Sequence, residues 1–183
     1  MATPVVKKIN NPEEVLKKIT DPDKVLGIMK NAKRLKNKGH YELCFSHYCD
    51  LKAAEHETDS FIVRGYYRFL YAYEQALTEK NGKRTNAGFL KKAVTNRTEQ
   101  NGGDAEKGIV AALTELVTKK GASSGYQFLM YSGQSKLTAE YLVKENPQYF
   151  SKEAVTAATE KLNSWEPSMA DSKTRSLIDG DWG

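Results

Sequence analysis

The chain has 183 residues, and its composition and charge exclude several classes of protein. A hydrophobic content of 39% and ten tyrosines argue against a wholly disordered chain. A mean hydropathy of -0.63 and the lack of any apolar run long enough to cross a bilayer argue against a membrane-spanning protein. The N-terminal residues contain no apolar signal segment, so the expected location is cytoplasmic and no membrane partner is expected. The formal net charge of +5 favours acidic partners.

Helix signals recur along the chain, and the sequence predicts an all-α fold of about seven to nine helices. A short first helix is predicted to begin at Pro12. Asp21 and Pro22 supply a cap and a first-turn proline for a second helix, which Gly39 is expected to end. A third helix is predicted from His40 to Ala54.

The central element is expected to be a helix from Phe61 to Glu79, because its apolar and aromatic residues form one broad stripe. Five further helices are predicted, over 87–94, from the cap Asp104 toward Gly121, over 124–132, over 137–145, and after the cap Ser151. The composition turns polar after Trp165. The sequence therefore predicts one compact helical domain over residues 1–165 and a disordered tail over 166–183.

Two basic blocks without acidic residues are the most informative feature of the chain. The first covers Lys24 to Tyr41 and the second covers Lys80 to Thr98, and each carries six basic side chains. Lysine and arginine clusters release counterions when they contact phosphates, so the blocks favour binding to nucleic acid. Thr85 and Asn86 add polar donors at the start of a predicted helix and are expected to fix the register. The predicted contact residues are Lys80, Lys83, Arg84, Thr85, Asn86, Lys91, Lys92, Arg97, Lys30, Lys33, Arg34 and Lys36.

The same blocks have two alternative interpretations. Each block is also consistent with a solvated helix face, because an amphipathic helix places polar residues outward. The charges would also serve a helical protein-interaction module, an adaptor or inhibitor that docks on an acidic surface of another protein. We expect non-catalytic nucleic-acid binding, with DNA favoured over RNA, and keep the interaction module as the alternative.

Metal and catalytic signals are weak. His40, Cys44 and His47 share one face of a predicted helix and Cys49 lies nearby, but no second ligand pair accompanies them elsewhere in the chain. Packed core residues and free thiols are the expected interpretation, with no metal and no cofactor. No phosphate-binding glycine loop or nuclease carboxylate motif occurs. Enzyme activity is therefore not expected, although a helical enzyme using Glu55, Glu74 or His47 remains a third hypothesis.

Two segments resemble small helical bacterial and phage-type proteins of poorly described role. The first is EKNGKRT at Glu79 to Thr85, which precedes a helix, and the second is TAEYLV, followed by a proline and an FS pair, over residues 138–151. The resemblance covers about residues 25 to 163. It implies a small helical fold from a bacterium or phage, found near DNA-processing genes, and so supports the nucleic-acid hypothesis.

Overall fold

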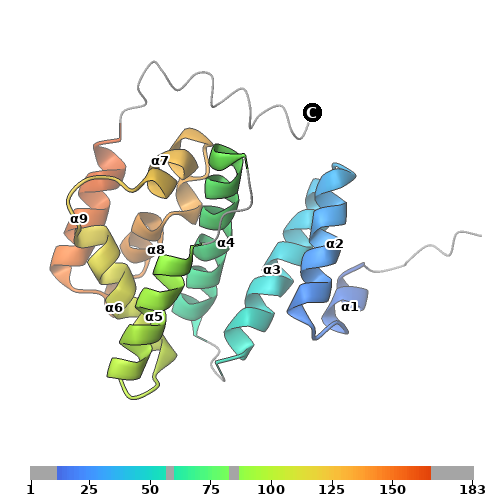
Figure 1. The fold of residues 1–183 in the computed structure, drawn as a ribbon, viewed down its shortest axis with the longest axis horizontal. Coiled ribbons are helices and arrows are strands. Elements are labelled where there is room, and N and C mark those ends of the chain that lie inside the picture. The colour runs from blue at the N-terminus through green and yellow to red at the C-terminus, as the bar shows by residue number, and fades with distance from the viewer. Residues whose placement is uncertain (1–11, 57–59, 83–86, 166–183) are drawn as a thin grey trace, which may run out of the picture. The chain divides into compact units, whose positions relative to one another are not determined.

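The fold is all-α, as the sequence predicts. The computed structural model describes residues 12–56, 60–82 and 87–165, and the side chains of 79–81 and Ser124 lie outside the described part. Within these residues the chain forms nine α-helices and two 3-10 helices, and no strand (Figure 1). Their bounds are α1 Pro12–Lys17, α2 Pro22–Arg34, α3 Lys38–Ala54, α4 Phe61–Asn81, α5 Gly88–Gln100, α6 Ala105–Thr118, α7 Ser124–Tyr131, η1 Ser135–Leu137, α8 Ala139–Glu145, η2 Pro147–Tyr149 and α9 Lys152–Asn163.

The chain divides into two compact units, Met1–Leu51 and Lys52–Gly183. The boundary falls inside α3, which contributes most of its length to the first unit. The expectation of a single domain over residues 1–165 stays a prediction, and the predicted tail over 166–183 lies outside the described residues. No helix within the described residues is both long and apolar enough to cross a bilayer.

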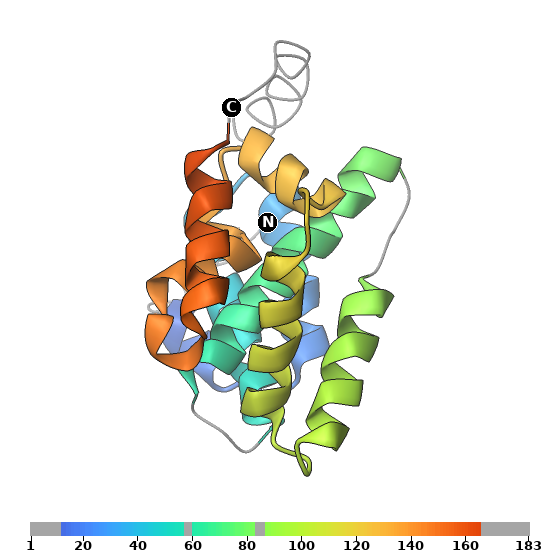
Figure 2. The ribbon, with the colours of Figure 1, turned by 90° about the vertical axis from the view of Figure 1, so that its left-hand side faces the viewer.

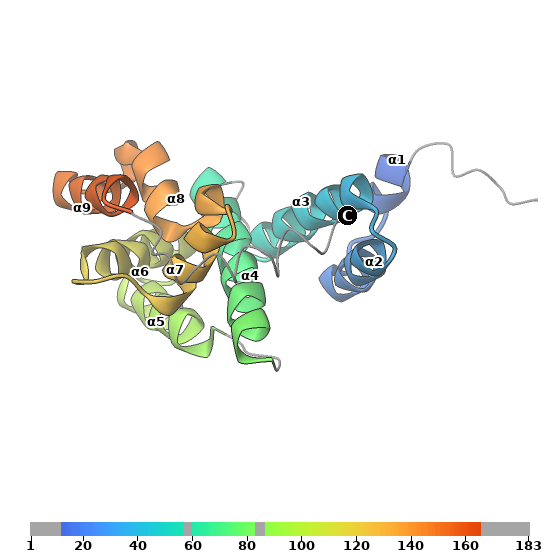
Figure 3. The same cartoon turned by 90° about the horizontal axis from the view of Figure 1, so that it is seen from above.

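The first unit contains α1, α2 and most of α3, the blue to cyan helices of Figure 3. Asp21 caps α2 as the sequence predicts, since its carboxylate accepts a hydrogen bond of 2.9 Å from the backbone N–H of Asp23. Buried side chains come from all three helices. They are Leu16, Val25, Met29, Ala32, Cys44, Phe45 and Cys49.

The prediction that Gly39 ends α2 is wrong, because Gly39 lies inside α3. The helix ends instead at a Schellman motif formed by lysine. The Lys36 N–H donates to the Lys33 carbonyl over 3.0 Å and the Asn37 N–H donates to the Ala32 carbonyl over 2.9 Å. Lys36 adopts the left-handed conformation, with φ 55°, which glycine usually occupies at this position. Because the helix stops before the expected glycine, the α2–α3 turn is short.

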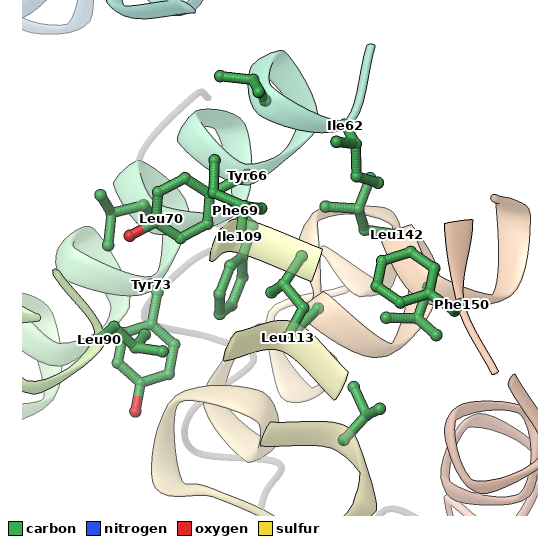
Figure 4. Packing of buried hydrophobic residues seen from close by; sticks show 14 of the residues in the cluster. Ile62, Tyr66, Phe69, Leu70, Tyr73, Leu90, Ile109, Leu113, Leu142 and Phe150 are labelled. Carbon is green, nitrogen blue, oxygen red and sulfur yellow. The ribbon is translucent and has the colours of Figure 1, made fainter. Parts of the chain in front are cut away.

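The second unit is built around α4, which is buried on more than one face. Its Ile62, Tyr66, Phe69 and Tyr73 join a large apolar cluster with residues of α5, α6, α8 and α9 (Figure 4). Ala72 and Ala76 of α4 pack separately with Leu129 of α7. Fully burying an apolar side chain of this size contributes about 1.5–3 kcal/mol. The broad apolar stripe in the sequence therefore corresponds to a central helix.

Helices α5 and α6 form a closely packed pair, and Figure 2 shows α6 between α5 and α9. A Cβ on Gly108 of α6 would overlap the backbone of Thr98 in α5, so glycine permits this approach. Helix α5 extends to Gln100, beyond the predicted end at residue 94, and Gly102 and Gly103 form the loop with positive φ.

The last helices start at hydroxyl caps. Ser123, Thr138 and Ser151 each accept a backbone N–H at the start of α7, α8 and α9. The sequence predicts that Leu137 begins the helix ending at Glu145, but Leu137 belongs to η1, because Thr138 interrupts the helix with an extended backbone and caps α8.

Candidate nucleic-acid interface

Five cations surround the junction between α2 and α3. Lys30 and Arg34 lie one helical turn apart on α2 and are exposed, on a different face from the buried Val25 and Met29. Lys36 lies in the turn itself. We name the set the α2–α3 basic segment; its members are Lys30, Lys33, Arg34, Lys36 and Lys38.

Hydrogen bonds from the backbone to Asn37 fix the geometry of this junction. The Asn37 side-chain oxygen accepts the backbone N–H of His40 over 3.0 Å, and its carbonyl accepts the Tyr41 N–H over 3.0 Å. Asn37 thus caps the beginning of α3 directly after closing the Schellman motif. The lysines and arginine near the end of α2 also stabilise the negative end of that helix dipole. No acidic residue occurs between Asp23 and Glu42, so this part of the sequence carries positive charge alone.

Two cations of the second basic block, Lys91 and Arg97, pair with carboxylates from other helices. Lys91 Nζ on α5 lies 2.8 Å from Glu74 Oε1 on α4. The same Glu74 oxygen accepts the Ala87 backbone N–H over 2.9 Å, at the start of α5. Ala87 is the N-cap of α5 and makes no side-chain cap bond, and its own N–H is satisfied by a carboxylate from α4. The Lys91–Glu74 ion pair therefore links α5 to α4.

Arg97 near the end of α5 also forms an ion pair with a carboxylate from another helix. Its guanidinium lies 3.0 Å from Glu115 Oε2 on α6 and donates to Gln100 Oε1 over 2.8 Å. Lys119 also approaches Glu115, at 3.1 Å. The Arg97 guanidinium, followed by the Lys119 ammonium, lowers the pKa of the Glu115 carboxyl. The charge of Arg97 is thus shared with a carboxylate from the neighbouring helix.

The remaining predicted contact residues divide as follows. Lys92 on α5 is exposed. Lys80 lies in α4, and its side chain is outside the described part; Lys83, Arg84, Thr85 and Asn86 lie outside the described residues altogether. Lys30, Lys33, Arg34 and Lys36 belong to the first unit, whereas Lys91, Lys92 and Arg97 belong to the second.

The histidines and cysteines of α3 that suggested a metal site include His47, which makes a hydrogen bond within the first unit, and two buried cysteines. His47 Nε2 lies 2.8 Å from the Ile19 carbonyl oxygen; since a carbonyl only accepts, this nitrogen carries the proton and donates. Cys44 and Cys49 are buried free thiols, and burial raises the pKa of Cys44. Among the described residues, no three His, Cys, Asp or Glu side chains are arranged to hold a metal ion.

The carboxylates considered for catalysis have structural partners. Glu55 pairs with Lys52, and Glu74 pairs with Lys91. The buried carboxyl in the described part of the fold is instead Glu140 on α8, and burial raises its pKa. The sequence offered no signal for this residue, because Glu140 occupies a buried position in a helix whose other buried residues are apolar.

No protein-family model, curated protein or solved structure matches the chain. The resemblance to bacterial and phage-type proteins therefore remains an expectation from the two sequence segments.

Proposed function

We propose that the protein binds nucleic acid without catalysis, and that the α2–α3 basic segment is the principal contact in the described part of the chain. DNA is the form favoured for the first test. The observation that carries the proposal is a set of five cations around one short turn, with no acidic residue from Lys24 to Tyr41.

The geometry of this turn supports phosphate contact. Lys30 and Arg34 are exposed on one helix face, and Lys36 and Lys38 are exposed in the turn and at the start of α3. A fixed backbone reduces the conformational entropy that is lost when side chains settle on a rigid polyanion. The positive end of the α3 dipole and the negative end of the α2 dipole both lie at this junction, so the cations and not the helix dipoles supply the attraction for phosphate.

Fluorescence anisotropy with random duplex and single-stranded DNA and RNA, at two salt concentrations, tests the proposal. We expect binding that weakens steeply with salt, because each neutralised phosphate adds about 0.9 to the slope of log K against log salt on duplex DNA. The variant Lys30→Gln/Arg34→Gln should bind about tenfold more weakly and lose nearly two units of that slope.

The matched control is Lys144→Gln/Lys152→Gln, which removes the same charge from exposed positions on α8 and α9. Its affinity should change by less than about twofold. Equal losses of affinity in both variants would show that binding depends on net charge alone. Unchanged affinity in the α2 variant would show that the segment is not the contact. Lys83→Glu/Arg84→Glu tests the contribution of the residues outside the described part; if it alone abolishes binding, the contact belongs there.

A further inference from the structure

A cavity of about 260 Å³ lies in the second unit, between α4, η1 and α8. Its inner walls are the buried Phe69 and Leu142 together with Leu137. Gly65 also lines it, at a point where α4 approaches α8 so closely that a Cβ on Gly65 would overlap Leu142. The cavity is therefore framed by packed helices and not by a loop.

The two buried polar side chains that line the cavity, Thr138 and Asn146, already have hydrogen-bond partners in the protein. The Thr138 hydroxyl donates to the Ser135 carbonyl over 2.7 Å and accepts the Tyr141 N–H over 3.1 Å. The Asn146 side-chain amide donates to the Leu142 carbonyl over 2.8 Å. A ligand recognised through hydrogen bonds would have to compete with these bonds, so the cavity favours an apolar occupant.

The exposed residues at the cavity combine an aromatic ring with cations. Phe61 lines the cavity with 61% of its surface exposed. Arg68 and Lys136 are exposed lining residues, and Glu145 is the acidic residue among them. Exposed aromatic side chains beside a pocket are typical of protein contact sites, whose energy is concentrated in a few such anchors. The basic side chains at the cavity complement a partner that carries carboxylates.

We propose that this cavity is a docking site for an apolar side chain of a partner polypeptide, and that acidic residues flank that side chain. The volume lies below the range of about 300–1,000 Å³ that is common for small-molecule sites, so it suits one inserted side chain. Phe61 covers the inserted group, and Lys136 meets the flanking carboxylates.

A nucleobase fits this site less well. Its hydrogen-bonding edge would be buried against Leu137, Leu142 and Phe69, which offer it no partner. The docking site is thus independent of the α2–α3 basic segment, and the inference does not rest on the proposed nucleic-acid binding.

Selection of a random dodecapeptide library on the immobilised full chain tests this inference. The selected peptides should share one large apolar residue with Asp or Glu beside it. Their dissociation constants are then measured by fluorescence anisotropy against the wild-type chain and two pairs of variants.

The first pair compares Phe61→Ser with Phe89→Ser. Phe89 on α5 has a similar exposure, 57%, but does not line the cavity. Peptide affinity should fall at least about tenfold in Phe61→Ser and by less than about twofold in Phe89→Ser. Circular dichroism verifies that both variants remain helical.

The second pair compares Lys136→Glu with Lys144→Glu, an exposed α8 lysine outside the cavity lining. We expect a loss of about fivefold in Lys136→Glu that diminishes at high salt, and little change in the control. If Phe61→Ser does not fold, this second pair alone tests whether the peptides bind at the cavity.

Four outcomes would overturn the inference. They are recovery of no peptide, selected peptides without acidic residues, equal affinity in the cavity variants and their controls, and a dimer in sedimentation that Phe61→Ser dissociates. The last outcome would assign the cavity to a second copy of the chain. Lys30→Gln/Arg34→Gln should bind the peptides normally, so failure here is distinguishable from failure of the nucleic-acid proposal.

Discussion

The two basic blocks are similar in sequence but occupy different settings in the fold. Each has six cations and no acidic residue of its own. The α2–α3 basic segment gathers its cations at a capped turn, whereas Lys91 and Arg97 on α5 meet Glu74 and Glu115 from neighbouring helices. A run of basic residues therefore does not by itself identify a polyanion surface, because carboxylates from elsewhere in the fold can compensate it.

The largest expected difference between the regions is in nucleic-acid affinity. Removing Lys91 and Arg97 in the variant Lys91→Gln/Arg97→Gln should change affinity by less than about twofold, against about tenfold for Lys30→Gln/Arg34→Gln. The α5 variant should instead lower the free energy of unfolding by about 0.5 kcal/mol, because it removes two exposed ion pairs. Anisotropy and urea titration measure the two effects, and a reversed order of affinities would contradict the comparison.

The second effect is a gain of affinity when the compensating carboxylates are removed. Glu74→Gln/Glu115→Gln raises the formal net charge from +5 to +7, an increase of two. It leaves Lys91, Arg97 and Lys119 without these carboxylate partners, while glutamine at residue 74 can still accept the Ala87 N–H. We expect DNA binding to strengthen roughly fivefold at low salt and this gain to vanish at high salt.

An unchanged affinity in that double variant would mean that ion pairing does not limit α5. Glu153→Gln/Glu160→Gln is a control for net charge alone, since these exposed carboxylates lie on α9, outside both basic blocks. An equal gain in this control would attribute the effect to total charge.

The third prediction separates stability from binding within the α2–α3 basic segment. Lys36 occupies a left-handed conformation with φ 55°, which costs a residue with a side chain roughly 1 kcal/mol relative to glycine. Lys36→Gly should therefore raise the free energy of unfolding by up to about 1 kcal/mol while weakening DNA binding. Thermal unfolding and anisotropy measure both changes.

Lys38→Gly is the matched control for Lys36→Gly, because it removes a charge at the start of α3 without relieving a left-handed residue. It should weaken binding without a gain in stability. Destabilisation by Lys36→Gly would show that the lysine side chain contributes more to the turn than its backbone conformation costs.

The smallest expected effect concerns pH. The Arg97 guanidinium, with Lys119, holds the pKa of Glu115 below its usual range in the folded state. The stabilisation is present above the unfolded pKa of about 4.3 and is lost as the pH falls through the lower folded value. These groups are exposed, so the effect is a few tenths of a kcal/mol. Urea midpoints at pH 7 and pH 3 should differ less in Glu115→Gln than in the wild-type chain; an identical difference would refute the assignment.

The sequence by itself determined the all-α class and the placement of most helices. Caps at Asp21, Asp104 and Ser151 act within a few residues, so a local pattern suffices to locate these helix starts. The end of α2 was predicted wrongly because Lys36 adopts the left-handed conformation at the helix end, where glycine is the residue usually expected.

The tertiary structure alone decided which charges are compensated and where a cavity opens. Glu74 and Glu115 lie several helical turns from their partners Lys91 and Arg97 along the chain, and helix packing brings them together. The cavity likewise combines Phe61, at the start of α4, with Lys136 of η1, a much later part of the sequence. Helix propensity and capping depend on neighbours within one turn, whereas charge pairing and cavities depend on which helix faces meet, and only packing of the whole unit fixes those faces.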